Sequence, residues 1–283
     1  MTASKFRWRR AGEDVLLYGF LIAVSLFMLM PFVWMVSTSL KSPEEIFARP
    51  ITLVPPDASL NAYITLIQHY NVLGALANTA LIATAATLLS LFFCSMGGYG
   101  FAKFRFPGRG VMFAFLLGTM IIPFTVIIIP LYVIMRDLKW LDTFWPMIVP
   151  GAASAFGIFF MRQYISSIST ELLDAARIDG AGEFAIYQRI IVPIILPGLT
   201  SLGLIFFMGS WNAYLWPLLV LTSPPHFTLP LVIWNLNEPI GATQTTYHLQ
   251  MAASVISIIP LLIIFLVFQR RLIDGITAGA VKS

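Results

Sequence analysis

Polar and apolar residues along this chain are sorted into long blocks, and six blocks contain no Asp, Glu, Lys or Arg. A helix needs about 20 consecutive, mainly apolar residues to cross a hydrocarbon core about 30 Å thick. The six blocks therefore predict six transmembrane helices and an all-α fold. The predicted spans are Val15–Leu40, Asn78–Ala102, Val111–Met135, Thr143–Met161, Pro197–Leu221 and Met251–Gln269.

The composition agrees with a polytopic membrane protein. Hydrophobic residues make up 58% of the 283 residues, charged residues make up 11%, and the mean hydropathy is +0.85. A soluble domain carries about 25% charged residues, so these values exclude a soluble enzyme, a disordered tail and a secreted disulfide scaffold. The first span follows four basic residues, as a signal peptide would. It exceeds a signal-peptide core of about 7–15 residues and no A-x-A site follows, so we expect a retained helix.

Basic residues predict the orientation, because Lys and Arg concentrate on the cytoplasmic side of membrane proteins. Of the 17 Lys and Arg residues, 13 lie in the two termini and in the second and fourth loops, and 4 lie in the other loops. Both termini are therefore expected in the cytoplasm, which also explains the pI of about 9.3. The predicted parts are a cytoplasmic N-terminus (1–14), a transmembrane domain (15–269) and a cytoplasmic C-terminal tail (270–283).

Prolines and short amphipathic patterns interrupt the regular spans. Pro123 and Pro130 each remove a backbone donor inside the third span and should bend or break it, either as a structural kink or along a substrate path. Before the second span, Ser59–His69 predicts a short interfacial helix with Ser59 as its N-cap. Its apolar face comprises Leu60, Ile64 and Ile67. On the outer side, the proline-containing segment Thr222–Gln250 predicts a folded-back connector.

The spans lack the groups that drive most ion-coupled transport. Proton- and voltage-driven proteins place ionisable residues in the membrane, and the predicted spans contain none, although sodium coupling through backbone carbonyls stays open. No Gly-Lys pair occurs in the chain, so it has no phosphate-binding loop. Cys94 is the sole cysteine and the three histidines are widely separated, so we expect neither a disulfide nor a metal site. Active transport would need a partner that hydrolyses the nucleotide.

The fourth loop, 170–193, has a pattern of two short helices joined by a sharp turn at Asp179-Gly180, which we call the knee. Thr170 can cap the first helix, and Asp174 and Arg177 are spaced to form an i, i+3 ion pair. Gly180 follows an aspartate and can take the left-handed conformation that ends a helix. The second helix carries one apolar stripe, Phe184, Tyr187 and Ile191. The segment is either a knob for a cytoplasmic partner or an amphipathic linker on the lipid headgroups.

The spacing of residues in this loop resembles the EAA loop of ABC importer permeases. That motif has an acidic residue followed by two alanines, then Gly, Ile, a Leu-type residue and Pro at fixed intervals. Here these positions are Asp174, Ala175, Ala176, Gly180, Ile190, Val192 and Pro193. Asp174 stands where the family usually has Glu, and Val192 stands where Leu is common. Asp keeps the negative charge of Glu at this position but is shorter by one methylene.

Two further segments narrow the resemblance to the smaller permease of maltose-type carbohydrate importers. Trp211–Pro217 resembles the fifth-span signature, and Phe268–Arg270 with Gly275–Lys282 resembles the carboxyl terminus of that subunit. The resemblance implies a six-helix type I ABC importer permease in the cell membrane, with no catalysis of its own. Its implied partners are a second permease in a heterodimer, a homodimeric ATPase that binds ATP and Mg²⁺, and an extracytoplasmic solute-binding protein.

The resemblance also implies which residues act. The residues expected to couple to the ATPase are Asp174, Ala175, Ala176, Asp179, Gly180, Ala181, Phe184, Ile190 and Pro193. The tail residues expected to contact the ATPase are Gly275, Thr277, Ala278 and Gly279. Those expected along the substrate path are Trp211, Asn212 and Tyr214, with Trp216 as a further aromatic. The expected cargo is a sugar or oligosaccharide; glycerol phosphate or another polyol, and a self-contained secondary transporter, are the alternatives.

Overall fold

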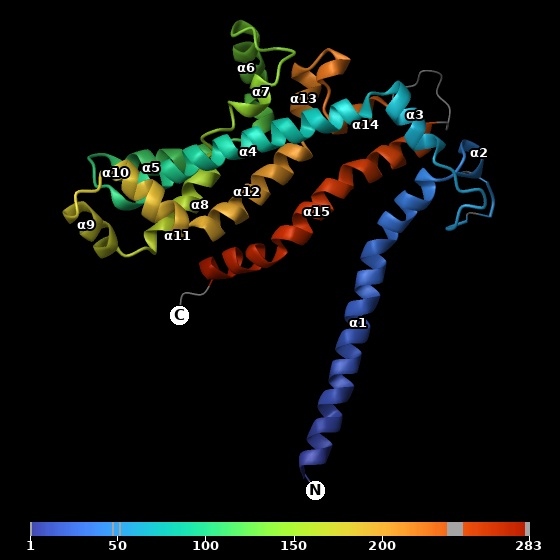
Figure 1. The fold of residues 1–283 in the computed structure, drawn as a ribbon, viewed down its shortest axis with the longest axis horizontal. Coiled ribbons are helices and arrows are strands. Elements are labelled where there is room, and N and C mark those ends of the chain that lie inside the picture. Colours follow the sequence, from blue (N-terminus) through green and yellow to red (C-terminus); the bar gives the residue numbers. More distant parts are fainter. Residues whose placement is uncertain (1, 47, 51, 237–245, 281–283) are drawn as a thin grey trace. The chain divides into compact units, whose positions relative to one another are not determined.

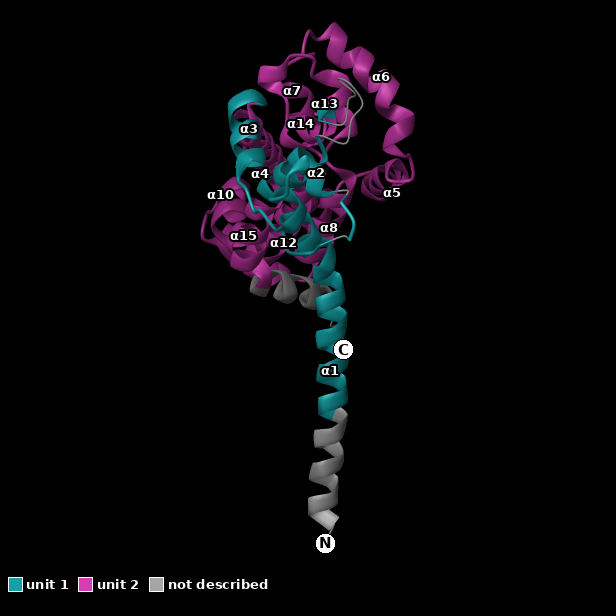
Figure 2. Cartoon of the chain, turned by 90° about the vertical axis from the view of Figure 1, so that its right-hand side faces the viewer, with its two compact units in different colours: residues 1–70, 235–256 teal, residues 71–234, 257–283 magenta. Residues whose placement is uncertain are grey.

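The computed structural model describes residues 2–46, 48–50, 52–236 and 246–280, with side chains between positions 14 and 269 of these ranges. The regular secondary structure of these residues is helical throughout, which confirms the all-α prediction. The chain divides into two compact units (Figure 2). Unit 1 comprises residues 1–70 and 235–256, and unit 2 comprises residues 71–234 and 257–283.

Unit 1 contains the long first helix and a short helix before the second span. The first helix, α1, covers Thr2–Ser39, and α2 covers Pro43–Ile46. The short helix α3, Asn61–His69, begins two residues later than predicted, although the Ser59 hydroxyl still accepts a hydrogen bond from the Asn61 N–H at 3.2 Å. The predicted apolar face is exposed, whereas Ala62 and Leu66 on the other side are buried.

Unit 2 is built on three packed helices, α4 (Val72–Lys103), α8 (Ala155–Ser166) and α12 (Leu196–Trp211) (Figure 1). The helix α4 packs along both of the others. Gly98 permits the close approach of α4 and α8, because a Cβ there would lie 2.6 Å from the Cβ of Met161. The close packing of α4 on α8 therefore requires a residue without a side chain at position 98.

Three helices are long and apolar enough to span a membrane without a break: Asp14–Ser39 within α1, the whole of α4, and Tyr247–Gln269 within α15 (Tyr247–Ala280). Two helix pairs with a sharp bend are apolar and long enough together to be either a broken span or a re-entrant loop. The first pair, α5 (Arg109–Thr119) and α6 (Phe124–Asp137), bends by 97°. Pro123 lies at that bend, as predicted, whereas Pro130 lies inside α6. The second pair joins Glu183–Ile194 to α12 with a bend of 79°.

The predicted fourth span is not one helix. It contains α7 (Trp145–Ile148), a turn, and then α8, which begins at Ala155. The Pro150-Gly151 pair follows α7, and the Ser154 hydroxyl caps α8 by accepting a hydrogen bond from the Gly157 N–H at 3.4 Å. These local signals outweigh the apolar composition of the run, so the total of six spans stays a prediction.

The segment after α12 folds back onto α4, as expected for the first part of the predicted connector. It contains α13 (Leu215–Val220), a 3₁₀ turn η2 (Pro224–His226) and α14 (Leu229–Asn235). The Thr79 hydroxyl of α4 accepts a hydrogen bond from the Leu229 N–H at 2.8 Å. Residues 237–245 of the connector lie outside the described ranges.

A carboxylate fixes the start of this fold-back. The Asp142 carboxylate accepts hydrogen bonds from the Ser223 hydroxyl and from the N–H groups of Thr222 and Ser223, the latter two at 2.9 Å. These donors, led by the Ser223 hydroxyl, hold the pKa of Asp142 well below its usual range. The carboxylate is therefore charged at neutral pH and binds the turn as an anion.

Candidate coupling loop

The loop between α8 and α12 begins with a capped helix, α9 (Thr170–Ile178). Its N-cap is Ser169, whose hydroxyl accepts a hydrogen bond from the Glu171 N–H at 3.2 Å. The prediction that Thr170 is the cap is wrong by one residue, because Ser169 keeps the extended backbone of a cap and Thr170 is already helical. Glu171 lies in the first turn, where its negative charge suits the helix dipole.

The helix α9 ends in a Schellman motif at Gly180. The Ala181 N–H donates to the Ala176 carbonyl and the Gly180 N–H donates to the Arg177 carbonyl, both at 3.0 Å. Gly180 has a φ of +81°, which confirms the predicted left-handed conformation. A Cβ at Gly180 would meet no atom within 4 Å, so the backbone angle alone selects glycine at this knee.

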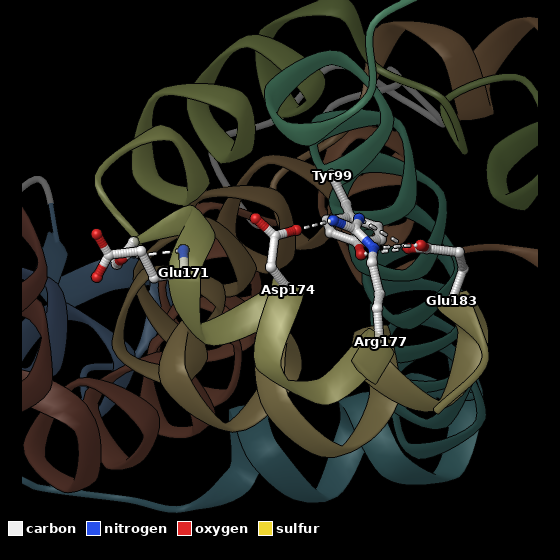
Figure 3. Close-up of polar contacts among 6 residues, drawn as sticks. Tyr99, Glu171, Asp174, Arg177 and Glu183 are labelled. Carbon is white, nitrogen blue, oxygen red and sulfur yellow. Dashed lines mark hydrogen bonds and ion pairs between the residues drawn. The ribbon is translucent and has the colours of Figure 1, made fainter. Parts of the chain in front are cut away.

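An ion network closes the knee (Figure 3). The Arg177 guanidinium donates to Asp174 at 2.7 Å, as its spacing predicts, and to Glu183 on the far side of the turn at 2.8 Å. These two acceptors, Glu183 first, raise the pKa of Arg177 above its usual value. The Tyr99 hydroxyl of α4 donates to the other Glu183 oxygen at 2.8 Å. Side chains on both sides of the knee are thus joined to each other and to α4.

The second half of the loop is anchored in the core of unit 2. It comprises α10 (Glu183–Ile186), a π-helical turn η1 (Tyr187–Ile191) and α11 (Val192–Ile194). Ile186 and Ile191 are fully buried, and they pack in one cluster with Leu173 of α9 and Met161 of α8. The hydroxyl groups of Tyr187 and Ser95 are 2.7 Å apart, which gives a second bond to α4.

The predicted stripe of the second helix is only partly correct. Tyr187 and Ile191 are buried, but Phe184 is 60% exposed. In a π-helical turn each N–H bonds the carbonyl five residues earlier, whereas in an α-helix it bonds the carbonyl four residues earlier. The buried face therefore runs through Ile186 and Ile191, five residues apart, and Phe184 lies outside it. Its ring still contacts that of Tyr187, with the ring centres 6.1 Å apart.

The surface of the loop presents apolar side chains beside the knee. Ile178 is 86% exposed and Leu172 is 45% exposed, and neither was among the predicted contacts. Helical spacing could have identified Ile178, because a residue five positions after the buried Leu173 lies on the opposite face of α9. Among the predicted coupling residues, those exposed on the surface are Asp174, Ala175, Asp179, Gly180, Phe184 and Pro193. Those half-buried against the core are Ala176, Ala181 and Ile190.

The residues predicted along the substrate path have different surroundings and different partners. Trp211 is 1% exposed, and its indole N–H donates to the Ser257 carbonyl at 3.2 Å. Asn212 is exposed and donates to the Met208 carbonyl, and Tyr214 packs against Trp234. Their contact with substrate stays a prediction.

The predicted tail contacts fall at the end of α15. The backbone of this helix is described to Ala280, but the side chains of Gly275, Thr277, Ala278 and Gly279 lie outside the described residues. Among side chains that are described, no three His, Cys, Asp or Glu residues lie close enough together to hold a metal ion.

Comparison with known proteins identifies the family. The family described as the binding-protein-dependent transport system inner membrane component matches residues 95–277, which include the whole coupling loop. The chain belongs to this family. It is therefore a membrane-spanning permease component of a transport system and not an enzyme, in agreement with the resemblance of the loop.

Individual relatives cover almost the whole permease. It is 34% identical over 269 residues to the arabinooligosaccharides transport system permease protein AraQ of Halalkalibacterium halodurans, covering 94% of each chain. It is 32% identical over 274 residues to the lactose transport system permease protein LacG of Rhizobium radiobacter, covering 97% of this chain and 98% of that protein. A crystal structure of a bacterial ABC transporter involved in the import of the acidic polysaccharide alginate is similar, with a TM-score of 0.79 and 27% identity, covering 91% of this chain and 97% of that one.

Proposed function

We propose that this permease is one of two membrane subunits of an ATP-driven, binding-protein-dependent importer for a sugar or oligosaccharide. Its coupling loop docks on a partner ATPase and transmits the closure of that ATPase to the membrane helices, which alternate between two access states. A partner can shift such an equilibrium only through different affinities for the two states. A rigid loop that fits a closing cleft supplies that difference.

The observation that carries this proposal is the construction of the coupling loop. Its two helices are joined by a glycine turn and by the Arg177 network, and its buried face belongs to the same core as α4 and α8. A force applied at the knee therefore acts on the helix packing of unit 2. The exposed Ile178 and Phe184 beside the knee provide apolar contacts for a partner, since exposed apolar groups on one segment are typical of docking sites.

The wider assembly follows from the family and from the sequence. We infer a second permease, a homodimeric ATPase that binds ATP and Mg²⁺, and an extracytoplasmic solute-binding protein. This chain would bind no cofactor. It would lie in the cytoplasmic membrane with six spans and both termini inside, as the distribution of Lys and Arg favours. The end of α15, with Gly275 and Gly279, would reach the ATPase from the same side.

A sugar is the cargo that the relatives favour, because two of them are named for arabinooligosaccharides and for lactose. The similar crystal structure belongs to an importer of an acidic polysaccharide, so an anionic cargo such as glycerol phosphate is the second candidate. An anionic cargo would need cationic groups along the path. The predicted spans contain none, so that cargo would depend on charges from the second permease.

The test replaces Gly180 in the complete complex, reconstituted in proteoliposomes with its binding protein. Gly180→Val should insert normally but lose at least 10-fold in ATP-driven uptake. A side chain at φ +81° costs about 1–2 kcal/mol or more in the left-handed region, so the knee would change shape. Gly182→Val is the matched control, because Gly182 lies two residues away with a φ of −70° that valine accepts.

Two results would contradict the proposal. Normal ATP-linked uptake by Gly180→Val would show that transport does not depend on the shape of the coupling loop. Uptake by the purified chain alone in liposomes, driven by an ion gradient, would identify a self-contained secondary transporter instead.

A further inference from the structure

Unit 2 contains a cavity of about 330 Å³ toward the end of α4 that lies away from the coupling loop. Helices α4, α7, α12 and α13 contribute to its wall, and every residue that lines it is uncharged. Six of them carry hydroxyl groups: Thr79, Thr87, Ser90, Ser154, Ser210 and Thr228. The walls between these hydroxyls are apolar or aromatic, which is the usual composition of a small-molecule site.

Three of these hydroxyls have structural roles. The Thr79 hydroxyl bonds the Leu229 N–H, Ser90 donates to the Gly151 carbonyl at 3.1 Å, and Ser154 caps α8. The hydroxyls of Thr87 and Thr228 differ, because both are buried and neither has a hydrogen-bond partner in the described chain. Buried polar groups are nearly always hydrogen-bonded. Both side chains line the cavity through their other atoms, since neither hydroxyl oxygen has accessible surface of its own. A rotation about χ1 would exchange the methyl group for the hydroxyl at the cavity wall, where a polar occupant would satisfy it.

An aromatic wall completes the site. The Trp216 indole lines the cavity, and its N–H already donates to the Pro146 carbonyl at 2.8 Å. Phe124 packs edge-on against the indole, with the ring centres 6.0 Å apart. The indole is therefore held in place, with its polar edge satisfied. It can offer the occupant an apolar surface but no hydrogen bond.

We propose that this cavity binds one neutral sugar unit during transport, through the hydroxyls of Thr87 and Thr228 and the ring of Trp216. The inference rests on the proposed function, and it assigns part of the sugar path to this subunit. A sugar ring has hydroxyls that donate and accept hydrogen bonds and C–H faces that pack on an aromatic ring. An anion would find no cation in the wall.

The experiment replaces each threonine that has an unpaired hydroxyl with valine, which has nearly the same shape but no hydroxyl. Thr87→Val and Thr228→Val are compared in the reconstituted complex, at saturating loaded binding protein. The probe is radiolabelled arabinotriose or lactose, whichever the binding protein retains. Each variant should lower uptake about 2- to 10-fold, the effect of one neutral hydrogen bond, with binding-protein-stimulated ATPase activity within 2-fold of wild type. Thr84→Val is the matched control, because Thr84 lies on the exposed side of α4 and does not line the cavity.

A cavity that binds no sugar would give a different and equally measurable result. In a mere packing void, removal of an unsatisfied hydroxyl would leave uptake unchanged and raise the thermal stability of the complex, and that result would overturn the proposal. Failure of the wild-type complex to take up the retained sugar would overturn the proposed function, and this inference with it. Normal wild-type uptake with unaffected variants would overturn the cavity assignment alone.

A second variant covers the case in which the valine variants fail to assemble. Gly209 lines the cavity, and a Cβ placed there meets no atom within 4 Å, so the side chain of Gly209→Leu should start in open space and occupy part of the cavity. We expect an intact complex whose uptake falls at least 10-fold. Gly118→Leu is its control, since Gly118 also has open space but lies outside the cavity wall. Equal uptake by the two leucine variants would refute the site.

Discussion

Leu172 and Leu173 are adjacent in α9 but have opposite environments, and they separate the framework of the coupling loop from its docking surface. Leu173 is fully buried, whereas Leu172 is 45% exposed. Leu173→Ala removes three carbon groups, about 2.4 kcal/mol of transfer free energy at about 0.8 kcal/mol each. The cavity left behind raises the expected loss of stability to about 2–5 kcal/mol. Because Leu173 lies in one buried cluster with Ile186 and Tyr187 of the same loop, this loss falls on the loop itself.

Amide hydrogen exchange in the purified complex measures the effect locally. A loss of about 3 kcal/mol increases local opening roughly 100-fold, so the amides of α9 and α10 should exchange about 100-fold faster in Leu173→Ala. Leu172→Ala should exchange as wild type does. Its effect should appear in the association with the ATPase, which we expect to weaken because an apolar docking contact is lost.

Equal exchange in the two variants would refute this reasoning. It would mean that contacts outside this core hold the loop, and the Arg177 network is too weak to supply them. The charged side chains of that network are about one-third to more than half exposed, and exposed ion pairs contribute only about 0–1 kcal/mol each. A wild-type exchange rate in Leu173→Ala therefore requires a stabilising contact other than those described here.

Two further predictions concern packing and pH. Gly98→Ala should lower the thermal stability of the purified permease by about 1–3 kcal/mol, because its Cβ would lie 2.8 Å from the Arg162 backbone nitrogen, whereas Gly100→Ala, with open space, should be neutral or stabilising. The low pKa of Asp142 means that its carboxylate stabilises the fold-back fully above the unfolded pKa of about 3.9, and that this contribution is lost progressively as the pH falls from that value through the lower folded-state pKa. Asp142→Asn should therefore lower the thermal midpoint most at pH 7 and by a smaller amount at pH 3, where the folded carboxylate is still charged but part of the contribution has been lost; an equal decrease at both pH values would contradict this assignment.

Local sequence signals were sufficient where one residue decides the backbone. Gly180 follows an aspartate at the end of an amphipathic helix, and only glycine accepts its φ of +81° without strain. Pro123 interrupts the third span because no helix can donate a hydrogen bond at that position. The i, i+3 spacing of Asp174 and Arg177 likewise predicts their ion pair.

Two predictions were wrong because one assumed that a long apolar run forms one helix and the other assumed an α-helical period. The fourth apolar run was long enough to span a membrane, but its length conceals the Pro150-Gly151 break and the cap at Ser154. The stripe through Phe184 assumed an α-helical period, and the π-helical turn shifts the buried face to Ile186. Glu183 completes the Arg177 network from across the turn, and no spacing within one helix could reveal that pair.

The helix α4 carries contacts of both proposed sites. Near its C-terminal end, Tyr99 and Ser95 hold the coupling loop through hydrogen bonds of 2.8 and 2.7 Å. Thr87 lies in the cavity wall twelve residues before Tyr99, which is about 18 Å along the axis at 1.5 Å per residue. No proline interrupts α4, so a tilt of about 10° imposed at the loop would move the cavity wall by about 3 Å over that length. A displacement of that size breaks a hydrogen bond. An unbroken helix can therefore couple the loop to the cavity without the ionisable residues that the predicted spans lack.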